Sequence, residues 1–324
     1  MKQIALIGFG RIGQMHYQLI QQLPGLNVKY VVDQVVRPDV EITPLDKLQQ
    51  VLTDPDISGV AIATSSDAHL ELIELCIQHQ KNIFCEKPIS YDVGKLKLLK
   101  EKLLHHKARL QVGLNRRFDK DFSELKARIQ QGEIGDVRII KITNRDPKRP
   151  DLEFVKHSGG LLYDFVIHDF DMLNYLTGKT VTDIAIQGNA LIEPQLNQLN
   201  DIDTAIIHLK LSDGSLAIID VSRESGVGYD QRIEIHGANG LLKVENHCLS
   251  TITHHSQCGG SNPNFKYSFV ERYQDAYQQQ FCAFRDLLAD EMAQPVVGIN
   301  EIISAVELAD RTTKVLNRSK LEQL

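Results

Sequence analysis

The sequence of 324 residues lacks the features of several protein classes. No apolar run reaches the roughly 20 residues that span a bilayer, so we expect no membrane-spanning segment. The formal net charge of −6 argues against general binding to nucleic acid or to an anionic membrane surface. The amino terminus MKQIALIGFG is too short and too glycine-interrupted for a signal peptide, and it predicts a buried strand instead.

Cysteine is also scarce. The chain has five cysteines, an odd number without a CxxC pair, which suits a reducing cytoplasm. Cys76, Cys85 and Cys282 lie in apolar sequence and are expected to be buried thiols. The stretch HCLSTITHHSQCGG at 247–260 holds possible zinc ligands, but their spacing matches no common zinc module. A strand followed by a polar loop is the preferred prediction there, and we predict no bound metal.

The chain has two halves with different patterns, and its length suggests two domains. Residues 1–118 alternate strand-like and helix-like segments, which predicts a parallel sheet covered by helices on both faces. After residue 180 the apolar runs are strand-like. Asp213-Gly214 and Asn239-Gly240 lie between successive runs and predict hairpins. The second half should therefore carry an antiparallel or mixed sheet, and the last two long segments, 274–290 and 298–317, are predicted helices.

The motif GFGRIG places GxGxxG after a predicted strand and at the start of a predicted helix. In that context Gly8 permits the tight turn, Gly10 lets the backbone approach a pyrophosphate, and Gly13 lets the helix pack on the strand. The helix amino terminus supplies N–H donors for phosphate. Asp33 ends the second predicted strand, where its carboxylate can accept hydrogen bonds from ribose hydroxyls. These residues predict a bound dinucleotide; a glycine-rich turn without a ligand is the weaker alternative.

The stretch SGGLLYDFVIHDFDMLNYL at 158–176 puts acids and a histidine into apolar sequence. At about 100° per residue, Asp164, His168 and Asp171 share one face of a helix predicted over 161–177. Asp164 and His168 are four apart, so their side chains can meet. The pattern alone leaves three interpretations open: a solvated acidic face, a shared metal ion, or a base that a carboxylate orients.

Four motifs occur in the order GFGRIG, CEKPIS, QVGLNRRFD and SGGLLYDFVIHDFDM. In this combination the chain resembles the glucose–fructose oxidoreductase and inositol dehydrogenase family, most closely its inositol 2-dehydrogenase branch. The resemblance covers essentially the whole chain. It implies an α/β fold with an amino-terminal Rossmann domain over 1–118. It also implies an α/β domain over 119–324 with a large open, mainly antiparallel sheet, which often forms the oligomer interface.

The resemblance also assigns roles to single residues. The lysine of the family's EKP motif falls on Lys87, and its D-x-x-x-H pair falls on Asp164 and His168. A cis Lys87-Pro88 bond is implied as well. We predict that His168 is the general base, because its reference pKa of about 6.5 suits proton transfer near neutral pH. Asp164 would orient the ring, and Lys87, at a strand end, would stabilise developing alkoxide charge, so that no catalytic metal is needed.

Further contacts are carried over from the family in the same way. Acidic and polar substrate contacts fall on Asp171 and on Asp146 or Asn144, and a substrate tyrosine falls on Tyr229. Asp169 points to the apolar side of the predicted helix and is given no role. The expected cofactor-binding residues are Gly8, Gly10, Arg11, Ile12, Gly13, Asp33, Thr64, His69, Glu86 and Lys87.

We predict NAD as the cofactor rather than NADP, since Asp33 would repel a 2′-phosphate. Relatives usually have a full helix after this position, whereas QVVRPDVEITP is too short for one and brings Arg37 near the adenosine side. The resemblance implies oxidation of a cyclitol or sugar hydroxyl to a ketone, most closely by a myo-inositol 2-dehydrogenase. Another sugar or cyclitol isomer, or a non-catalytic NAD-binding sensor, are the alternatives. The expected partners are a small polyol and further copies of the chain, in a homodimer or homotetramer.

Overall fold

The computed structural model describes residues 1–35 and 37–321. Contacts within the chain divide it into two compact units. Unit 1 consists of Met1–Phe118 and Asp275–Val306, and unit 2 of Asp119–Gln274 and Glu307–Leu324. Helix α10 (Ile299–Leu321) contributes to both units. Within the described residues, no helix combines the length and the apolar character that a membrane crossing requires.

Unit 1 is built around a parallel sheet of six strands in the order β3-β2-β1-β4-β5-β6. The elements of this unit are β1 (Lys2–Ile7), α1 (Arg11–Gln21), β2 (Leu26–Asp33), β3 (Ile42–Pro44), η1 (Leu45–Lys47), α2 (Leu48–Thr53), β4 (Ile57–Ile62), α3 (Ser66–Gln78), β5 (Asn82–Cys85), α4 (Val93–Leu104), β6 (Leu110–Val112), η2 (Asn115–Phe118) and nearly all of α9 (Gln274–Ala289). This strand order is that of a dinucleotide-binding Rossmann fold.

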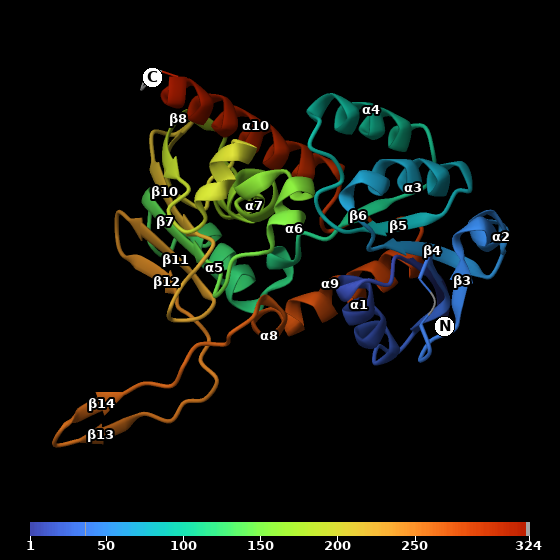
Figure 1. Ribbon diagram of the computed structural model, residues 1–324, viewed down its shortest axis with the longest axis horizontal. Coiled ribbons are helices and arrows are strands. Elements are labelled where there is room, and N and C mark those ends of the chain that lie inside the picture. The colour runs from blue at the N-terminus through green and yellow to red at the C-terminus, as the bar shows by residue number, and fades with distance from the viewer. Residues whose placement is uncertain (36, 322–324) are drawn as a thin grey trace. The chain divides into compact units, whose positions relative to one another are not determined.

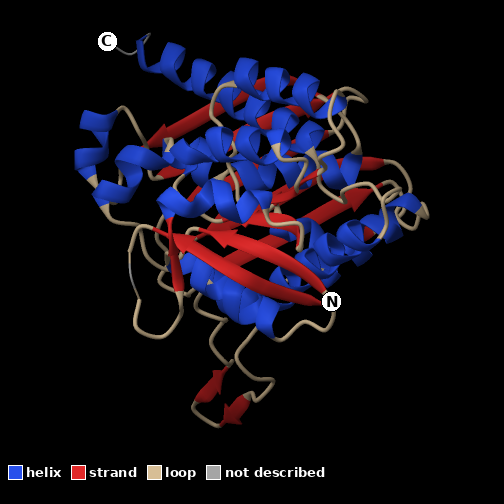
Figure 2. Ribbon diagram, turned by 90° about the vertical axis from the view of Figure 1, so that its right-hand side faces the viewer, coloured by secondary structure: helices blue, strands red, loops and turns tan. Residues whose placement is uncertain are grey.

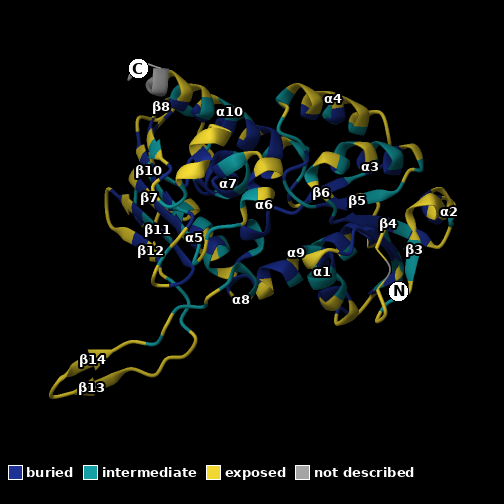
Figure 3. Ribbon diagram, viewed as in Figure 1, coloured by how far each residue is buried: buried dark blue, intermediate teal, exposed yellow. Residues whose placement is uncertain are grey.

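The central strands of unit 1 are apolar along their length because helices cover both faces of the sheet. Figure 3 shows these strands in the colour of buried residues. Phe281 and Phe284 of α9 join Ile4, Leu6 and Phe84 of the strands in one buried cluster. Cys76 and Cys85 are buried as predicted, and Cys282 is partly buried against the same cluster. The predicted parallel sheet is thus confirmed, including the lack of a helix in the described part of 34–41.

Unit 2 contains a mixed sheet of six strands in the order β12-β11-β7-β10-β9-β8. The elements of this unit are α5 (Lys120–Gln130), β7 (Val137–Arg145), α6 (Leu152–Ser158), the π-helical turn η3 (Leu161–Phe165), α7 (Ile167–Thr177), β8 (Val181–Asn189), η4 (Pro194–Leu199), β9 (Thr204–Leu211), β10 (Leu216–Ser222), β11 (Asp230–Gly237), β12 (Leu241–Val244), β13 (His254–Ser256), β14 (Gly259–Ser261) and α8 (Phe269–Arg272). Only β7 and β10 pair in parallel, so the sheet is mainly antiparallel, as predicted.

One face of this sheet is buried and the other is not. In β9, Ala205, Ile207 and Leu209 are buried, whereas the alternating His208 and Lys210 are exposed. This period of two is typical of a strand with a single covered face. The hairpins predicted at Asp213-Gly214 and Asn239-Gly240 join β9 to β10 and β11 to β12.

The segment 247–260 differs from the predicted strand and polar loop. Cys248 and Phe265 form an isolated bridge. The segment between them is a long loop with the two-stranded hairpin of β13 and β14 at its tip. Figures 1 and 2 both show this hairpin standing away from the rest of unit 2. Its strand residues are all exposed, because no other described element of unit 2 pairs with them.

Candidate active site

Two of the three motif glycines, Gly8 in the loop after β1 and Gly13 in the first turn of α1, stand where no other residue fits. Gly8 has a φ of +91°, and a Cβ on it would lie 2.6 Å from the carbonyl oxygen of Ala63. A Cβ on Gly13 would lie 2.0 Å from the carbonyl oxygen of Gly8. Gly13 therefore mainly lets α1 lie close to the glycine loop, whereas the sequence had assigned it to packing of the helix on the strand. This close turn brings the start of α1 next to the end of β4.

The amino terminus of α1 is open to a ligand. Its N-cap residue is Gly10, which makes no side-chain cap, and its first turn contains no acid. A Cβ on Gly10 would meet nothing within 4 Å, so the space in front of the helix is free of protein atoms there. Arg11 is exposed and Ile12 is half-buried beside this opening. Uncapped N–H groups with a positive dipole end suit a phosphate, so the loop fits a dinucleotide.

Asp33 is held at the end of β2 by two backbone donors. The N–H of Phe9 donates to one carboxylate oxygen at 2.5 Å, and the N–H of Val35 donates to the other at 2.8 Å. Phe9 belongs to the glycine loop, so the loop and the carboxylate fix each other. Each oxygen keeps a lone pair for a further donor, which is what ribose hydroxyls would supply.

Four predicted cofactor residues gather after the ends of β4 and β5. Lys87 is half-buried and the Lys87–Pro88 peptide bond is cis, as the resemblance implies. His69 is buried between two backbone carbonyls, with Nδ1 2.8 Å from the oxygen of Pro88 and Nε2 3.2 Å from that of Thr64. Glu86 is mostly buried and contacts His16. Because these segments follow parallel strands at one edge, they lie where doubly wound sheets bind ligands.

In unit 2, the helix predicted over 161–177 is not one regular α-helix. Leu161–Phe165 forms a π-helical turn, in which Val166 donates its N–H to the carbonyl of Leu161 at 3.0 Å. The α-helix α7 begins only at Ile167. The prediction that regular α-helical steps of 100° per residue separate Asp164 from His168 was therefore wrong. Short π-helical segments are frequently found at functional sites.

Two glycines and an aspartate set the start of this turn. Gly159 and Gly160 have φ angles of +79° and +80°. A Cβ on Gly160 would lie 2.6 Å from an oxygen of Asp201, which also accepts a hydrogen bond from the N–H of Leu161 at 3.0 Å. The SGG of the motif thus lets α6 end and the π-helical turn begin within two residues.

Asp164 has a cationic partner that the sequence did not reveal. Nη1 of Arg223 donates to Oδ2 of Asp164 at 3.0 Å, and both side chains are largely buried. The guanidinium also lies over the ring of Phe165, with Cζ 5.0 Å from its centroid. His168 is half-buried at the start of α7. Arg223 comes directly after β10. A charged residue just after an apolar strand was the only feature of the sequence that could have pointed to it as a site residue.

Asp171 and Asp169 are not part of a solvated face. Asp171 is 2% exposed and Asp169 is fully buried. Nδ2 of Asn144 donates to Asp169 at 2.5 Å, and Nε2 of Gln231 donates to Oδ1 of Asn144. This chain links α7 to β7 and β11 and gives Asp169 the role that the sequence left open. These hydrogen bonds use both side-chain amide atoms of Asn144, which is buried. Asp146, the alternative to Asn144 as a predicted substrate contact, is half-buried and therefore more accessible.

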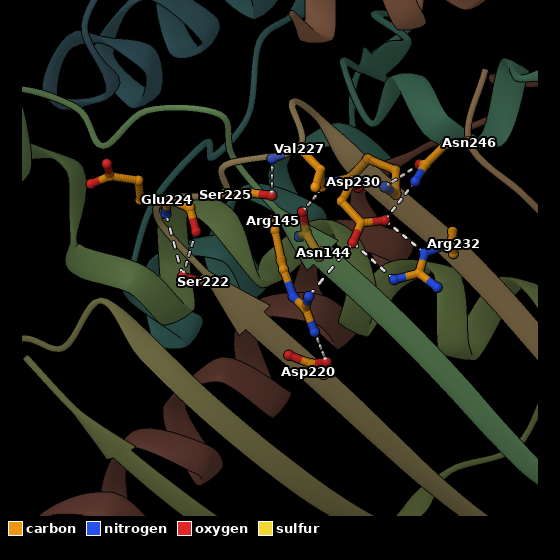
Figure 4. Close-up of polar contacts among 11 residues, drawn as sticks. Asn144, Arg145, Asp220, Ser222, Glu224, Ser225, Val227, Asp230, Arg232 and Asn246 are labelled. Atoms are coloured by element: carbon orange, nitrogen blue, oxygen red, sulfur yellow. Dashed lines mark hydrogen bonds and ion pairs between the residues drawn. The ribbon is translucent and has the colours of Figure 1, made fainter. Parts of the chain in front are cut away.

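A second polar cluster lies at the ends of β7 and β10 and the start of β11 (Figure 4). Asp230 accepts two hydrogen bonds from Arg232, at 2.7 and 2.9 Å, and one from Asn246 at 2.6 Å. Burial alone would raise the pKa of Asp230, but these donors outweigh it and lower that pKa. Arg145 bridges Asp230 and Asp220. The cluster fixes the backbone next to Tyr229, which is buried with its ring against Tyr273.

In the described part of the chain, no group of three histidine, cysteine, aspartate or glutamate side chains could hold a metal ion. Of the possible zinc ligands, His247 contacts Asp121 instead, with Nε2 2.5 Å from Oδ2. His254 and His255 lie on the exposed hairpin.

Family models match both halves of the chain. Residues 2–114 match an oxidoreductase family with an NAD-binding Rossmann fold, and residues 122–243 match the GFO/IDH/MocA C-terminal domain. The chain belongs to the GFO/IDH/MocA oxidoreductase family. The resemblance inferred from the motifs is confirmed, and the matched NAD-binding Rossmann fold includes the glycine loop of unit 1.

Similar proteins of this family come from several bacteria. Uncharacterized oxidoreductase YrbE of Bacillus subtilis is 36% identical over 318 residues, which are 95% of this chain and 93% of that protein. Myo-inositol 2-dehydrogenase of Thermotoga maritima is 33% identical over 291 residues, which are 87% of this chain and 86% of that protein. The crystal structure of scyllo-inositol dehydrogenase from Lactobacillus casei, with bound cofactor NAD(H) and scyllo-inositol, has a TM-score of 0.89. It is 26% identical and covers 98% of each chain.

Proposed function

We propose that this protein is an NAD-dependent cyclitol dehydrogenase, which oxidises a ring hydroxyl of myo-inositol to a ketone. The observation that carries the proposal is the combination of an NAD-binding loop, a lysine after β5, and the acid–histidine segment of η3 and α7 in one chain. Support comes from the match to myo-inositol 2-dehydrogenase of Thermotoga maritima across 87% of this chain.

Oxidation of an alcohol removes a proton from oxygen and a hydride from carbon. In the proposal His168 accepts the proton, as a neutral imidazole can near pH 7. Asp164 then stabilises the imidazolium through its negative charge. Arg223, 3.0 Å from the carboxylate, pairs with Asp164 and fixes its direction. The base therefore works beside a carboxylate that tertiary contacts hold in place.

Lys87 supplies the electrophilic side of the proposed reaction. Its ammonium donates a hydrogen bond to the reacting oxygen and stabilises alkoxide charge as the proton leaves. Lys87 is half-buried at the ligand-binding edge of the parallel sheet, so its charge is only partly screened by water. Asp146, Asp171 and Tyr229 are the proposed contacts to the remaining hydroxyls of the ring.

The proposed cofactor contacts follow from unit 1. NAD, when bound, supplies the hydride acceptor for the reaction. The uncapped start of α1 holds the pyrophosphate, together with the backbone at Gly10, Arg11 and Ile12. Asp33 accepts from the ribose hydroxyls, and Thr64 and Glu86 line the nicotinamide side.

A related substrate is the second candidate. The Lactobacillus casei protein, whose structure resembles this chain with a TM-score of 0.89, was solved with scyllo-inositol, an epimer of myo-inositol. Epimers differ only in the direction of one hydroxyl, so ångström-scale differences in the pocket decide between them. The same set of residues would carry out either reaction.

A substrate screen tests the proposal. The purified chain is mixed with NAD and, in turn, with myo-inositol, scyllo-inositol, other cyclitols and aldoses, and the reduced nicotinamide is followed by its absorbance. We expect the highest kcat/KM with myo-inositol. A higher value for scyllo-inositol would move the assignment to that epimer. NAD binding in calorimetry without turnover on any polyol would instead favour a non-catalytic NAD sensor.

A further inference from the structure

Lys87 lies between two residues that buried histidines hold. Nε2 of His16, on α1, is 2.7 Å from Oε1 of Glu86, and Nδ1 of His69, on α3, is 2.8 Å from the carbonyl oxygen of Pro88. The two histidines are 0% and 1% exposed. We propose that His16 and His69 are positioning residues that clamp the segment 86–88 from both sides and so aim the Lys87 ammonium. The inference rests on the proposed role of Lys87.

His16 is set in an aromatic pocket that fixes its ring. The ring centroids of Phe84, Tyr277 and Phe281 lie 5.6, 5.9 and 4.8 Å from that of His16. Nδ1 of His16 is buried and has no hydrogen-bond partner among the described residues. An apolar side chain would fill this pocket without leaving a polar atom unpaired. Packing therefore does not explain a histidine here, whereas its bond to Glu86 does.

The carboxylate of Glu86 transmits this contact to Lys87. Its Oε1 faces His16, and its Oε2 accepts a hydrogen bond from the backbone N–H of Lys87 at 3.3 Å. Gly113 closes the third side, because a Cβ there would lie 3.0 Å from the carboxylate. Since the carboxylate is confined on these sides, a displacement of His16 would also displace the lysine's own backbone.

His69 acts on the other neighbour of the lysine. Burial lowers the pKa of His69, so its ring is neutral and carries a single N–H. Both ring nitrogens face carbonyl oxygens, and the shorter distance, to Pro88, favours the proton on Nδ1. The ring thus donates its N–H to the segment after β5 and packs against Thr64, which follows β4. Both segments belong to the edge of the sheet where ligands bind.

Amide variants can keep or remove each contact without changing polarity. The amide nitrogen of Gln is as many bonds from Cα as Nε2 of His, and that of Asn is as many bonds from Cα as Nδ1. At position 16, His16→Gln keeps a donor to Glu86 and His16→Asn is too short. At position 69 the order reverses: His69→Asn keeps a donor to Pro88, and His69→Gln reaches toward Thr64 instead.

The four variants are compared by kcat and KM for the polyol at saturating NAD. We expect kcat to fall about a hundredfold in His16→Asn and His69→Gln, which is the usual cost of a misplacement near 1 Å. It should fall less in His16→Gln and His69→Asn, which keep the donor, and KM should change little in all four. NAD affinity is compared only at position 16, where it should change little, because His69 is itself among the expected cofactor-binding residues. In a Lys87→Ala background the same substitutions should cost nothing further, because the group that they aim is gone.

A second measurement does not depend on turnover. The lysines are reductively methylated with ¹³C, which preserves their charge, and the resonance missing from Lys87→Ala is assigned to Lys87. We expect this resonance to move toward those of exposed lysines in His16→Asn and His69→Gln, and to stay in place in the two variants that keep the contact. Wild-type protein without polyol turnover would overturn the proposed function, while the resonance would still decide on the clamp.

Two results would overturn the clamp itself. One is an unchanged Lys87 resonance together with near-normal kcat in His16→Asn and His69→Gln. The other is an equal loss of kcat with and without Lys87, since a general structural defect acts in both backgrounds. A purely structural role would also rank Gln and Asn in the same order at both positions, instead of the reversed order that the contacts predict.

Discussion

Arg223 and Asp164 are 59 residues apart in the sequence, and Nη1 of the arginine donates to the carboxylate at 3.0 Å. The arginine follows β10, and the aspartate lies in the π-helical turn before α7. The exposed fractions of the two side chains are 5% and 15%. The guanidinium compensates the carboxylate for hydration that burial removes. The proposed base, His168, therefore has an arginine-paired carboxylate four residues before it.

Removal of this arginine should damage both stability and activity. We expect Arg223→Met to lower the free energy of unfolding by about 3 kcal/mol, since it leaves a buried carboxylate without its cation. It should also lower kcat by on the order of 10–100-fold through misplacement of Asp164. Urea unfolding and steady-state kinetics measure the two effects. Arg128→Met, which removes an exposed pair with Glu133, is the control and should cost no more than about 0.5 kcal/mol.

His168 and Lys87 should each be needed for turnover but not for cofactor binding. His168→Ala is expected to lower kcat by roughly 10²–10⁴-fold, the usual effect of a positioned base. Lys87→Ala should lower it by about 10²–10³-fold through lost charge stabilisation. Wild-type oxidation should rise with pH as the imidazole loses its proton. Calorimetry should find nearly unchanged NAD affinity in His168→Ala; near-normal turnover in either variant would contradict the assigned roles.

Asp33 should set the preference for NAD over NADP. Its carboxylate is fixed by the N–H groups of Phe9 and Val35, so it cannot turn away from a 2′-phosphate without breaking two hydrogen bonds. We expect Asp33→Ala to narrow the ratio of kcat/KM for the two cofactors by about tenfold or more. Wild-type protein with higher kcat/KM for NADP than for NAD would refute this.

The uncovered face of the unit 2 sheet should be an interface between copies of the chain, in a homodimer or homotetramer. Leu216 lies beside Ile139, and His236 lies between Ile139 and Leu241, so three exposed apolar side chains and one histidine form a row across four strands. Exposed apolar side chains that lie together in this way are candidate contacts with another protein surface. We expect light scattering to find an oligomer that Ile139→Lys with Leu216→Lys dissociates. Leu98→Lys, an exposed site on α4, is the control; a wild-type monomer at micromolar concentration would exclude the interface.

Acid should weaken unit 1 through Asp54. Hydrogen bonds from Lys29, from the backbone N–H of Asp56 and from Tyr30 lower the pKa of Asp54 to about 2. An aspartate in the unfolded chain titrates near pH 3.9, so the stabilisation is complete above about pH 4 and is lost as pH falls toward 2. Urea unfolding of wild type should show this loss. Asp54→Asn should be less stable at pH 7 and should lack this part of the pH dependence, whereas Asp56→Asn should retain most of it.

Much of the fold could be predicted from local patterns. Alternating strands and helices predicted the parallel sheet, and the Asp-Gly and Asn-Gly pairs predicted both hairpins of unit 2. These features depend on neighbours in sequence, because periodicity fixes which face of an element is apolar and glycine permits the turns. The strand order and the β13–β14 hairpin were not predicted.

The sequence suggested which residues form the candidate site, but it did not reveal the contacts that hold them. The sequence by itself determined the glycine loop, the lysine after β5 and the acid–histidine segment. Only the tertiary structure decided that Asp164 pairs with Arg223, that Asp169 binds Asn144, and that His16 supports Glu86. Each of these contacts joins elements that are at least 25 residues apart. Their partners depend on strand register and on the π-helical turn, which local periodicity does not encode.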